Sequence, residues 1–158
     1  MLSVSRSVLT VALLVGSWSL PSAAKDIALI SSKPPWLTTI TLAELVKVAK
    51  GQISRWPDGK PVTFVIRDPA TPEMKIVLER IYELPADGVN GVIVAANHGR
   101  TNRPAIVVVA SDETLLRKVE ATPGALGLVD VYSITGGVAV VKIAGKLPLE
   151  PGYLLHGN

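Results

Sequence analysis

The chain alternates between apolar segments that suit buried strands and amphipathic segments that suit helices. Short apolar runs at 27–31 and 105–110 have the composition of buried strands. Residues 61–68 also predict a strand, with Val62, Phe64 and Ile66 on one face. Amphipathic segments at 41–51 and 111–121 lie between such strands. Because strands that alternate with helices pack as a sheet between helical layers, the sequence predicts a three-layer α/β sandwich with a mixed, mostly parallel sheet.

Several helix ends are marked by their residue types. Thr41 and Glu44 have the spacing of a capping box, and Gly51 can adopt the left-handed conformation that ends a helix. A further helix is predicted to follow Thr71 as its N-cap, with Pro72 at its first position.

Two other segments complete the predicted order of elements. Residues 88–98 suit a short strand or a buried helix equally, because Gly88 and Gly91 weaken a helix while the apolar run fits both. Residues 136–145 predict a last strand after a glycine turn, and the tail that follows shows little pattern. We expect one domain, with no internal repeat.

The first 24 residues have the pattern of an export signal. A basic residue precedes the apolar stretch at 8–16, and Ser22 and Ala24 occupy the two small-residue positions before a cleavage site. The alternative is an uncleaved membrane anchor, but the apolar stretch is shorter than the ~20 residues that a spanning helix needs. We therefore expect a signal peptide at 1–24, a single domain at 25–158, and a periplasmic or secreted location.

Composition argues against most kinds of chemistry. The chain has no cysteine, which excludes disulfides and thiolate metal sites. Its net charge is +3, and the first 24 residues hold one basic and no acidic residue, so the remaining 134 carry +2, which gives no reason to expect nucleic acid as a partner. His98 and His156 lack metal-ligand spacing, and no nucleophile or phosphate-loop motif is present. We predict no catalytic residue, no metal and no cofactor, and so a protein that is not an enzyme.

The turn "VIRDPATPE" is the best candidate for a binding site. A strand ends at Arg67 and Asp68, and a helix is predicted to start near Thr71. Such strand-to-helix turns in open α/β sheets are common ligand positions, and Arg67 can bind an oxyanion through charge-assisted hydrogen bonds. The alternative is an ordinary surface turn, since Pro72 lacks an amide hydrogen and Glu73 places negative charge at the helix start.

A second basic segment, "NHGRTNRP", contains Arg100 and Arg103. Two arginines without interleaved aromatic residues are typical of a solvated turn. The alternative is a role in binding an anion or a partner.

Two motifs resemble a known family. The stretch "ITLAELVKVAKGQISRWPDGKPVTFVIRD" is similar to a segment of the phosphate-binding periplasmic proteins of ABC importers, and closer still to small exported proteins that carry only that domain. In that family a leucine-rich helix leads into a pattern matched here by Gly51, Ile53, Trp56 and Gly59. "SDETLLRKVEATPGALGLVD" resembles the family's second signature, and the resemblance covers roughly residues 27–132.

The resemblance implies a type 2 periplasmic-binding-protein fold in which the Trp56 turn is scaffold. It also implies a non-enzymatic module that binds phosphate or a similar small oxyanion for an ABC-type phosphate transport system, with a transporter permease or an envelope protein as partner. The ligand-binding residues carried over are Arg67, Asp68 and Thr71, with Ser31 or Ser32 nearby.

The ligand loop departs from the family pattern. The phosphate binders have Arg-x-Asp-Gly-Ser-Gly-Thr where this chain has "RDPATPE", so the glycines are absent and only Thr71 offers a hydroxyl. The alternative function is therefore a ligand-free interaction or assembly module of the cell envelope that kept the fold and lost the phosphate site.

Overall fold

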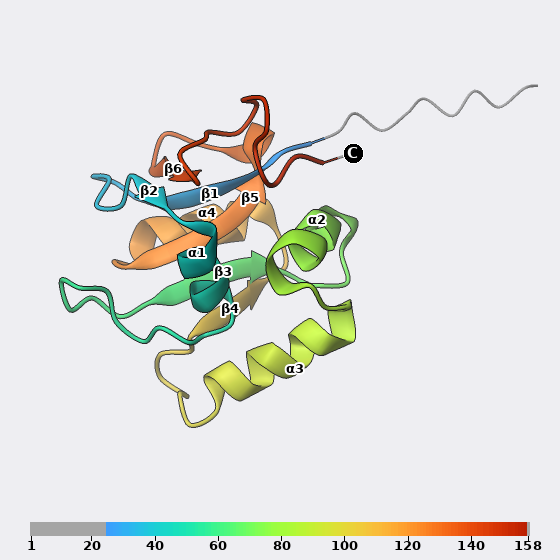
Figure 1. The fold of residues 1–158 in the computed structure, drawn as a ribbon. Coiled ribbons are helices and arrows are strands. Elements are labelled where there is room, and N and C mark those ends of the chain that lie inside the picture. Colours follow the sequence, from blue (N-terminus) through green and yellow to red (C-terminus); the bar gives the residue numbers. More distant parts are fainter. Residues whose placement is uncertain (1–24, 158) are drawn as a thin grey trace, which may run out of the picture.

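The computed structural model describes residues 25–157, so the expected signal peptide lies outside the described residues. A six-stranded sheet stands between helical layers (Figure 1). The strands are β1 (Ile27–Ser32), β2 (Thr39–Ile40), β3 (Thr63–Arg67), β4 (Ile106–Val109), β5 (Ala125–Asp130) and β6 (Val138–Ile143). The α-helices are α1 (Leu42–Ala49), α2 (Lys75–Val77), α3 (Ala86–Asn97) and α4 (Asp112–Ala121). Short 3-10 segments, η1 (Pro72–Met74) and η3 (Val131–Ser133), and a π-helical segment, η2 (Leu78–Tyr82), complete the chain.

The sheet is mixed, as predicted. The strand order is β2-β6-β1-β5-β3-β4. Strand β3 pairs in parallel with β4 and β5, and β2 pairs in parallel with β6. Strand β1 pairs antiparallel with both of its neighbours, β5 and β6, so it runs against all the others. Because β1 runs the opposite way, its amino end lies beside the carboxyl ends of the other strands.

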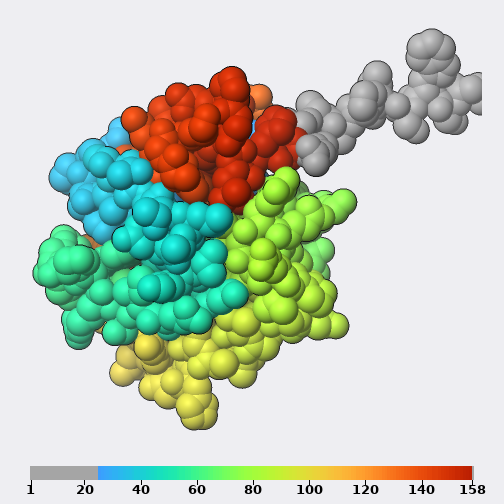
Figure 2. Space-filling model, viewed as in Figure 1, coloured from blue at the N-terminus to red at the C-terminus, as the bar shows by residue number. Residues whose placement is uncertain are grey.

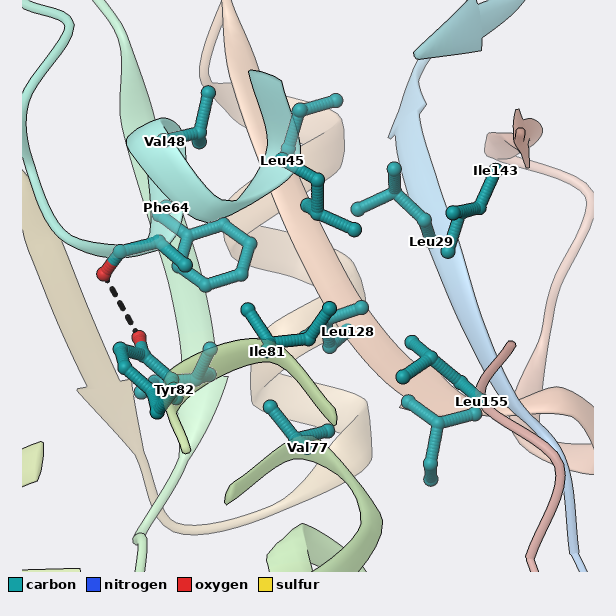
Figure 3. Packing of buried hydrophobic residues seen from close by; sticks show 14 of the residues in the cluster. Leu29, Leu45, Val48, Phe64, Val77, Ile81, Tyr82, Leu128, Ile143 and Leu155 are labelled. Atoms are coloured by element: carbon teal, nitrogen blue, oxygen red, sulfur yellow. Dashed lines mark hydrogen bonds between the residues drawn. The ribbon is translucent and has the colours of Figure 1, made fainter. Parts of the chain in front are cut away.

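Each face of the sheet has its own hydrophobic core. On one face, α1, α2, η2, α3 and the C-terminal segment pack against inward side chains of β1, β3 and β5. Figure 3 shows this packing, with Phe64 and Leu128 of the sheet facing Leu45 of α1 and Ile81 of η2. On the other face, α4 packs through Leu115, Leu116 and Val119. The three-layer α/β architecture is therefore confirmed.

Helix α1 begins and ends where its sequence predicts. The Thr41 hydroxyl accepts a hydrogen bond from the Glu44 amide at 3.2 Å, and the Glu44 carboxylate accepts one from the Thr41 amide at 3.0 Å. The bond from the Thr41 amide above all, and a second one from the Thr41 hydroxyl to the same carboxylate at 2.9 Å, lower the pKa of the Glu44 carboxyl. Gly51 has φ of +68°, and a Cβ there would lie 2.5 Å from that of Ala96, so only glycine lets the end of α1 approach α3.

The ambiguous segment at 88–98 is helical up to Asn97, the last residue of α3, and His98 is the C-cap. Of this helix only Val89 is fully buried, and Val94 is 72% exposed, so α3 lies on the sheet rather than inside the core. Its last residue, Asn97, holds the free edge of β4. The Asn97 side chain donates to the Ile106 carbonyl at 2.8 Å and accepts from the Ile106 amide at 3.0 Å. It thereby covers part of an unpaired strand edge.

The Trp56 turn is fixed to the core, as predicted. The Trp56 indole nitrogen donates to the Gly124 carbonyl at 2.8 Å, and its ring lies edge-on to Trp36 with centroids 5.1 Å apart. Gly124 has φ of +83°, and a Cβ there would lie 2.3 Å from the Pro61 carbonyl oxygen. The two segments that carry the family resemblance therefore meet in one contact.

The C-terminal segment is part of the core, although its sequence shows little pattern. Tyr153 and Leu155 are buried, and Figure 2 shows the red C-terminal chain lying against the cyan α1 region and the lime α2 region. The Tyr153 hydroxyl donates to the Ile27 carbonyl at 2.8 Å. Asp26, 1% exposed, holds the segment at two points: its carboxylate accepts from the Leu149 amide at 2.6 Å and lies 2.6 Å from Nδ1 of His156.

The contact between Gly124 and Pro61 predicts an unequal response of two glycines to alanine. Gly124→Ala should lower the free energy of unfolding by about 3 kcal/mol, because it adds a steric clash to an unfavourable φ. Gly59→Ala is the matched control: its φ is +88° but nothing lies within 4 Å of the added Cβ, so it should cost about 1 kcal/mol. Urea denaturation measures both, and equal losses would contradict a role for the close approach.

The buried Asp26 carboxylate predicts that the C-terminal segment depends on it. Asp26→Ala should cost about 2 kcal/mol, because it leaves the Leu149 amide without its acceptor. The free tail should also become sensitive to proteolysis. Glu79→Ala, an exposed change on η2, should alter neither. A tail as resistant to protease in Asp26→Ala as in wild type would show that the apolar contacts of Tyr153 and Leu155 suffice.

Candidate functional site

Four strand ends meet on the side of the sheet that holds the predicted binding loop. We call this side, where the parallel strands end, the carboxyl edge. The parallel strands β3, β4 and β5 finish there, at Arg67, Val109 and Asp130. The amino end of β1 reaches the same edge, because Ile27 pairs with Asp130 in the antiparallel register. In Figure 1 this is the right-hand edge, toward which the arrow of β3 points. In open α/β sheets this is the edge at which ligands bind.

Arg67 lies at the end of β3 and is held by α4. Its guanidinium donates to the Asp112 carboxylate at 2.6 Å, and the other Asp112 oxygen accepts from the Ser133 hydroxyl at 2.7 Å. The Arg67 and Asp112 side chains are only 19% and 24% exposed. Asp112 is the first residue of α4, where the helix dipole stabilises a carboxylate. The Nε of Arg67 is buried without a hydrogen-bond partner, so one of its donors remains unused.

The loop after Arg67 is held by hydrogen bonds that Asp68 accepts. The Asp68 carboxylate accepts from the Ala70 amide at 2.8 Å. The Asp68 carbonyl accepts from the Thr71 amide at 3.0 Å and from the Thr71 hydroxyl at 2.7 Å. Two amides that an anion would use are therefore already satisfied within the loop.

Thr71 is the N-cap residue by position but not by side chain. It precedes Pro72, the first residue of η1, as predicted, yet its hydroxyl turns back to Asp68 and makes no capping bond. The helix predicted from this point is irregular. It passes from η1 through α2 into the π-helical η2 and ends at Glu83, whose φ is +52°. Three apolar side chains of this irregular helix are nevertheless buried: Met74, Val77 and Ile81.

Ser31 and Ser32 do not lie near Arg67, so the structure does not bring this part of the predicted site together. Ser31 pairs with Leu126, which pairs with Phe64, three residues before the end of β3. Ser32 lies one step further away along β1. The reason is the direction of β1: as the antiparallel strand, it carries its carboxyl end to the opposite edge of the sheet. Ser31 is also fully buried. Arg67, Asp68 and Thr71 do lie together.

A second polar group lies at the same edge. The Asp130 carboxylate, 8% exposed as a residue, accepts from the Tyr132 amide at 2.9 Å and pairs with Lys25 at 3.1 Å. His156 contacts Asp26, although its side chain is 62% exposed. His98 is exposed.

The geometry of this edge supports binding through hydrogen bonds and gives no metal centre. Across residues 25–157, no group of three or more histidine, aspartate or glutamate side chains is placed to hold a metal ion. Nor does any helix in that range have the length and apolarity to cross a membrane.

Asp112 and Ser133 were missed from the sequence as site residues. In the sequence, Asp112 lies 45 residues from Arg67, and no motif connects the two. The signal that could have placed it is its position three residues after the end of β4, because parallel neighbouring strands end at one edge.

Comparison with known proteins places this fold. No family model and no curated protein matches the sequence. Solved structures do match. An ABC-type phosphate transport receptor from Vibrio cholerae aligns with 85% of this chain and 54% of its own length, at 17% identity and a TM-score of 0.66. PstS from Borrelia burgdorferi aligns with 85% and 55%, at 19% identity and 0.63.

A putative phosphate ABC transporter substrate-binding protein with bound phosphate, from Clostridium perfringens, aligns with 77% of this chain and 46% of its own, at 19% identity and a TM-score of 0.60. The chain thus spans about half the length of the structures it matches. At these identities the likeness concerns the fold, and it confirms the one implied by the two sequence motifs. The chain shares the periplasmic-binding-protein-type α/β fold of the matched part of these structures.

Proposed function

We propose that this chain is a non-enzymatic binding module that takes a small oxyanion, with phosphate the first candidate, at the end of β3. The observation that carries the proposal is the buried Nε of Arg67, which lacks a partner at the edge where such sheets bind ligands. A guanidinium can form paired, charge-assisted hydrogen bonds with an oxyanion. The matched structures support the same ligand class, because they include a phosphate transport receptor and a putative phosphate transporter substrate-binding protein with bound phosphate.

Two neighbouring carboxylates, those of Asp112 and Asp68, compete with an oxyanion for its binding groups. Asp112 already neutralises Arg67, and the Asp68 carboxylate occupies the Ala70 amide. An oxyanion must therefore compete with Asp68 for the loop and share Arg67 with Asp112. The proposal accordingly implies weak binding, by exchange of one anionic group for another.

The cellular setting is part of the proposal. An export signal at 1–24, cleaved to release the domain at 25–158, would place the module in the periplasm or outside the cell. There it would serve an ABC-type phosphate transport system, with a permease or envelope protein as its partner.

A second candidate function follows from the closed loop. Because Asp68 satisfies the loop amides, the module can keep the fold without a small ligand and act as an interaction or assembly module of the cell envelope.

Calorimetric titration with phosphate and sulfate separates the two candidates. Wild type should bind at least one anion, and Arg67→Ala should abolish the heat, because it removes the guanidinium. Asp68→Asn should bind about tenfold more tightly, since it removes the competing charge, worth about 1.4 kcal/mol. Arg117→Ala, an exposed arginine paired with Glu113 on α4, is the control and should bind like wild type.

The decisive results are clear in either direction. Silence in every titration, Asp68→Asn included, would reject the oxyanion proposal, and a stoichiometric partner purified from envelope extract would then support the second candidate. Equal losses in Arg67→Ala and Arg117→Ala would indicate non-specific charge effects and would also reject the site.

A further inference from the structure

Two adjoining hollows lie on the opposite side of the sheet, where β3, β4 and β5 begin. We call this side the amino edge. Their volumes are about 360 Å³ and about 390 Å³. The hollows share Pro61, Thr63, Asn102 and Arg103, so they form one continuous depression, which we call the basic trough. Its two ends are marked by cations: Arg55 and Arg100 line one hollow, and Lys118 lines the other.

The basic trough concentrates positive charge that no carboxylate offsets. Four cationic side chains line it, and no aspartate or glutamate does. Within residues 25–157, none of Arg100, Arg103 and Lys118 forms an ion pair, whereas Arg67 and Lys25 at the other edge are both paired.

The cations of the trough differ in how far their other contacts leave them available to an anion. The Arg55 guanidinium donates to the Gly59 carbonyl at 2.9 Å, which fixes its position on the turn without neutralising it. Lys118 lies on the last turn of α4, so the partial negative charge of the free helix carbonyls offsets part of its charge, and the arginines supply most of the attraction for an anion. Asn102 adds an amide group between the two hollows.

Size and charge together indicate the class of ligand. Each hollow falls at the lower end of the range of small-molecule sites, roughly 300–1,000 Å³. A single monovalent anion would neutralise one of the four cations, whereas a ligand with several anionic groups can engage both hollows on either side of Arg103. The walls at Pro61, Pro104 and Val107 leave room for an apolar spacer between such groups.

We propose that the basic trough is a second binding site, for a small multivalent anion that spans both hollows around Arg103. The trough lies at the beginnings of the strands that end beside Arg67, so the two sites occupy opposite edges of the sheet. The inference goes beyond the proposed function and does not depend on it.

Titration with tripolyphosphate at low ionic strength tests the proposal. The full chain should bind it, and Arg103→Gln should weaken binding by about tenfold, because it removes a charge-assisted contact shared by both hollows. Lys118→Gln should weaken it less, since Lys118 lines only one hollow. Arg117→Gln is the matched control: it removes one positive charge from the neighbouring position of α4, outside the trough, and should leave the affinity unchanged. Each variant changes an exposed side chain, and its thermal unfolding confirms the fold.

The same titration in Arg67→Ala keeps the two sites apart. Tripolyphosphate binding that persists in Arg67→Ala and is weakened by Arg103→Gln supports the trough, whatever phosphate does at Arg67. Absence of binding by wild type would overturn the proposal, as would equal weakening by Arg103→Gln and Arg117→Gln. Binding of a hexaglutamate peptide without binding of tripolyphosphate would overturn the small-ligand assignment and make the trough a surface for acidic polypeptides.

Discussion

The contact between Gly124 and the Trp56 turn joins parts of the fold that lie far apart in the sequence. The indole of Trp56 donates to the Gly124 carbonyl across 68 positions, and the missing side chain of Gly124 lets the Pro61 carbonyl approach. Pro61 leads into β3 and Gly124 leads into β5, so this contact sets how the two central parallel strands enter the sheet. Gly127 also permits a close approach, because a Cβ there would lie 2.7 Å from Val119 of α4. Glycine is needed here for close packing between layers.

Elements with a strong local signal could be predicted from the sequence. Helix α1 has its capping box and glycine stop, and α4 has Ser111, whose side chain accepts from the Thr114 amide as a cap should. The apolar runs of β1 and β4 predicted strands because they are short and bounded by breaking residues. At 88–98 the apolar run was compatible with both structures, and only packing against β4 decided for α3.

What the sequence could not provide was direction and long-range pairing. Periodicity identifies a strand but not which way it runs, and the antiparallel course of β1 alone removed Ser31 and Ser32 from the predicted site. The pairing of Arg67 with Asp112 has no local signal either. The tail gave little pattern because its burial rests on isolated residues, Tyr153 and Leu155, which a periodic criterion does not detect.

The two edges of the sheet differ in how their charges are balanced. At the carboxyl edge two cations have a carboxylate: Arg67 has Asp112, and Lys25 has Asp130. At the amino edge the cations of the basic trough have none within the described chain. A net charge of only +3 therefore conceals a strongly uneven distribution. Paired charges at an edge cost a ligand the displacement of a partner, whereas unpaired ones attract it without such a penalty. Fold likeness directs attention to the first edge, while the electrostatics of this chain favour the second as the more accessible place for an anion.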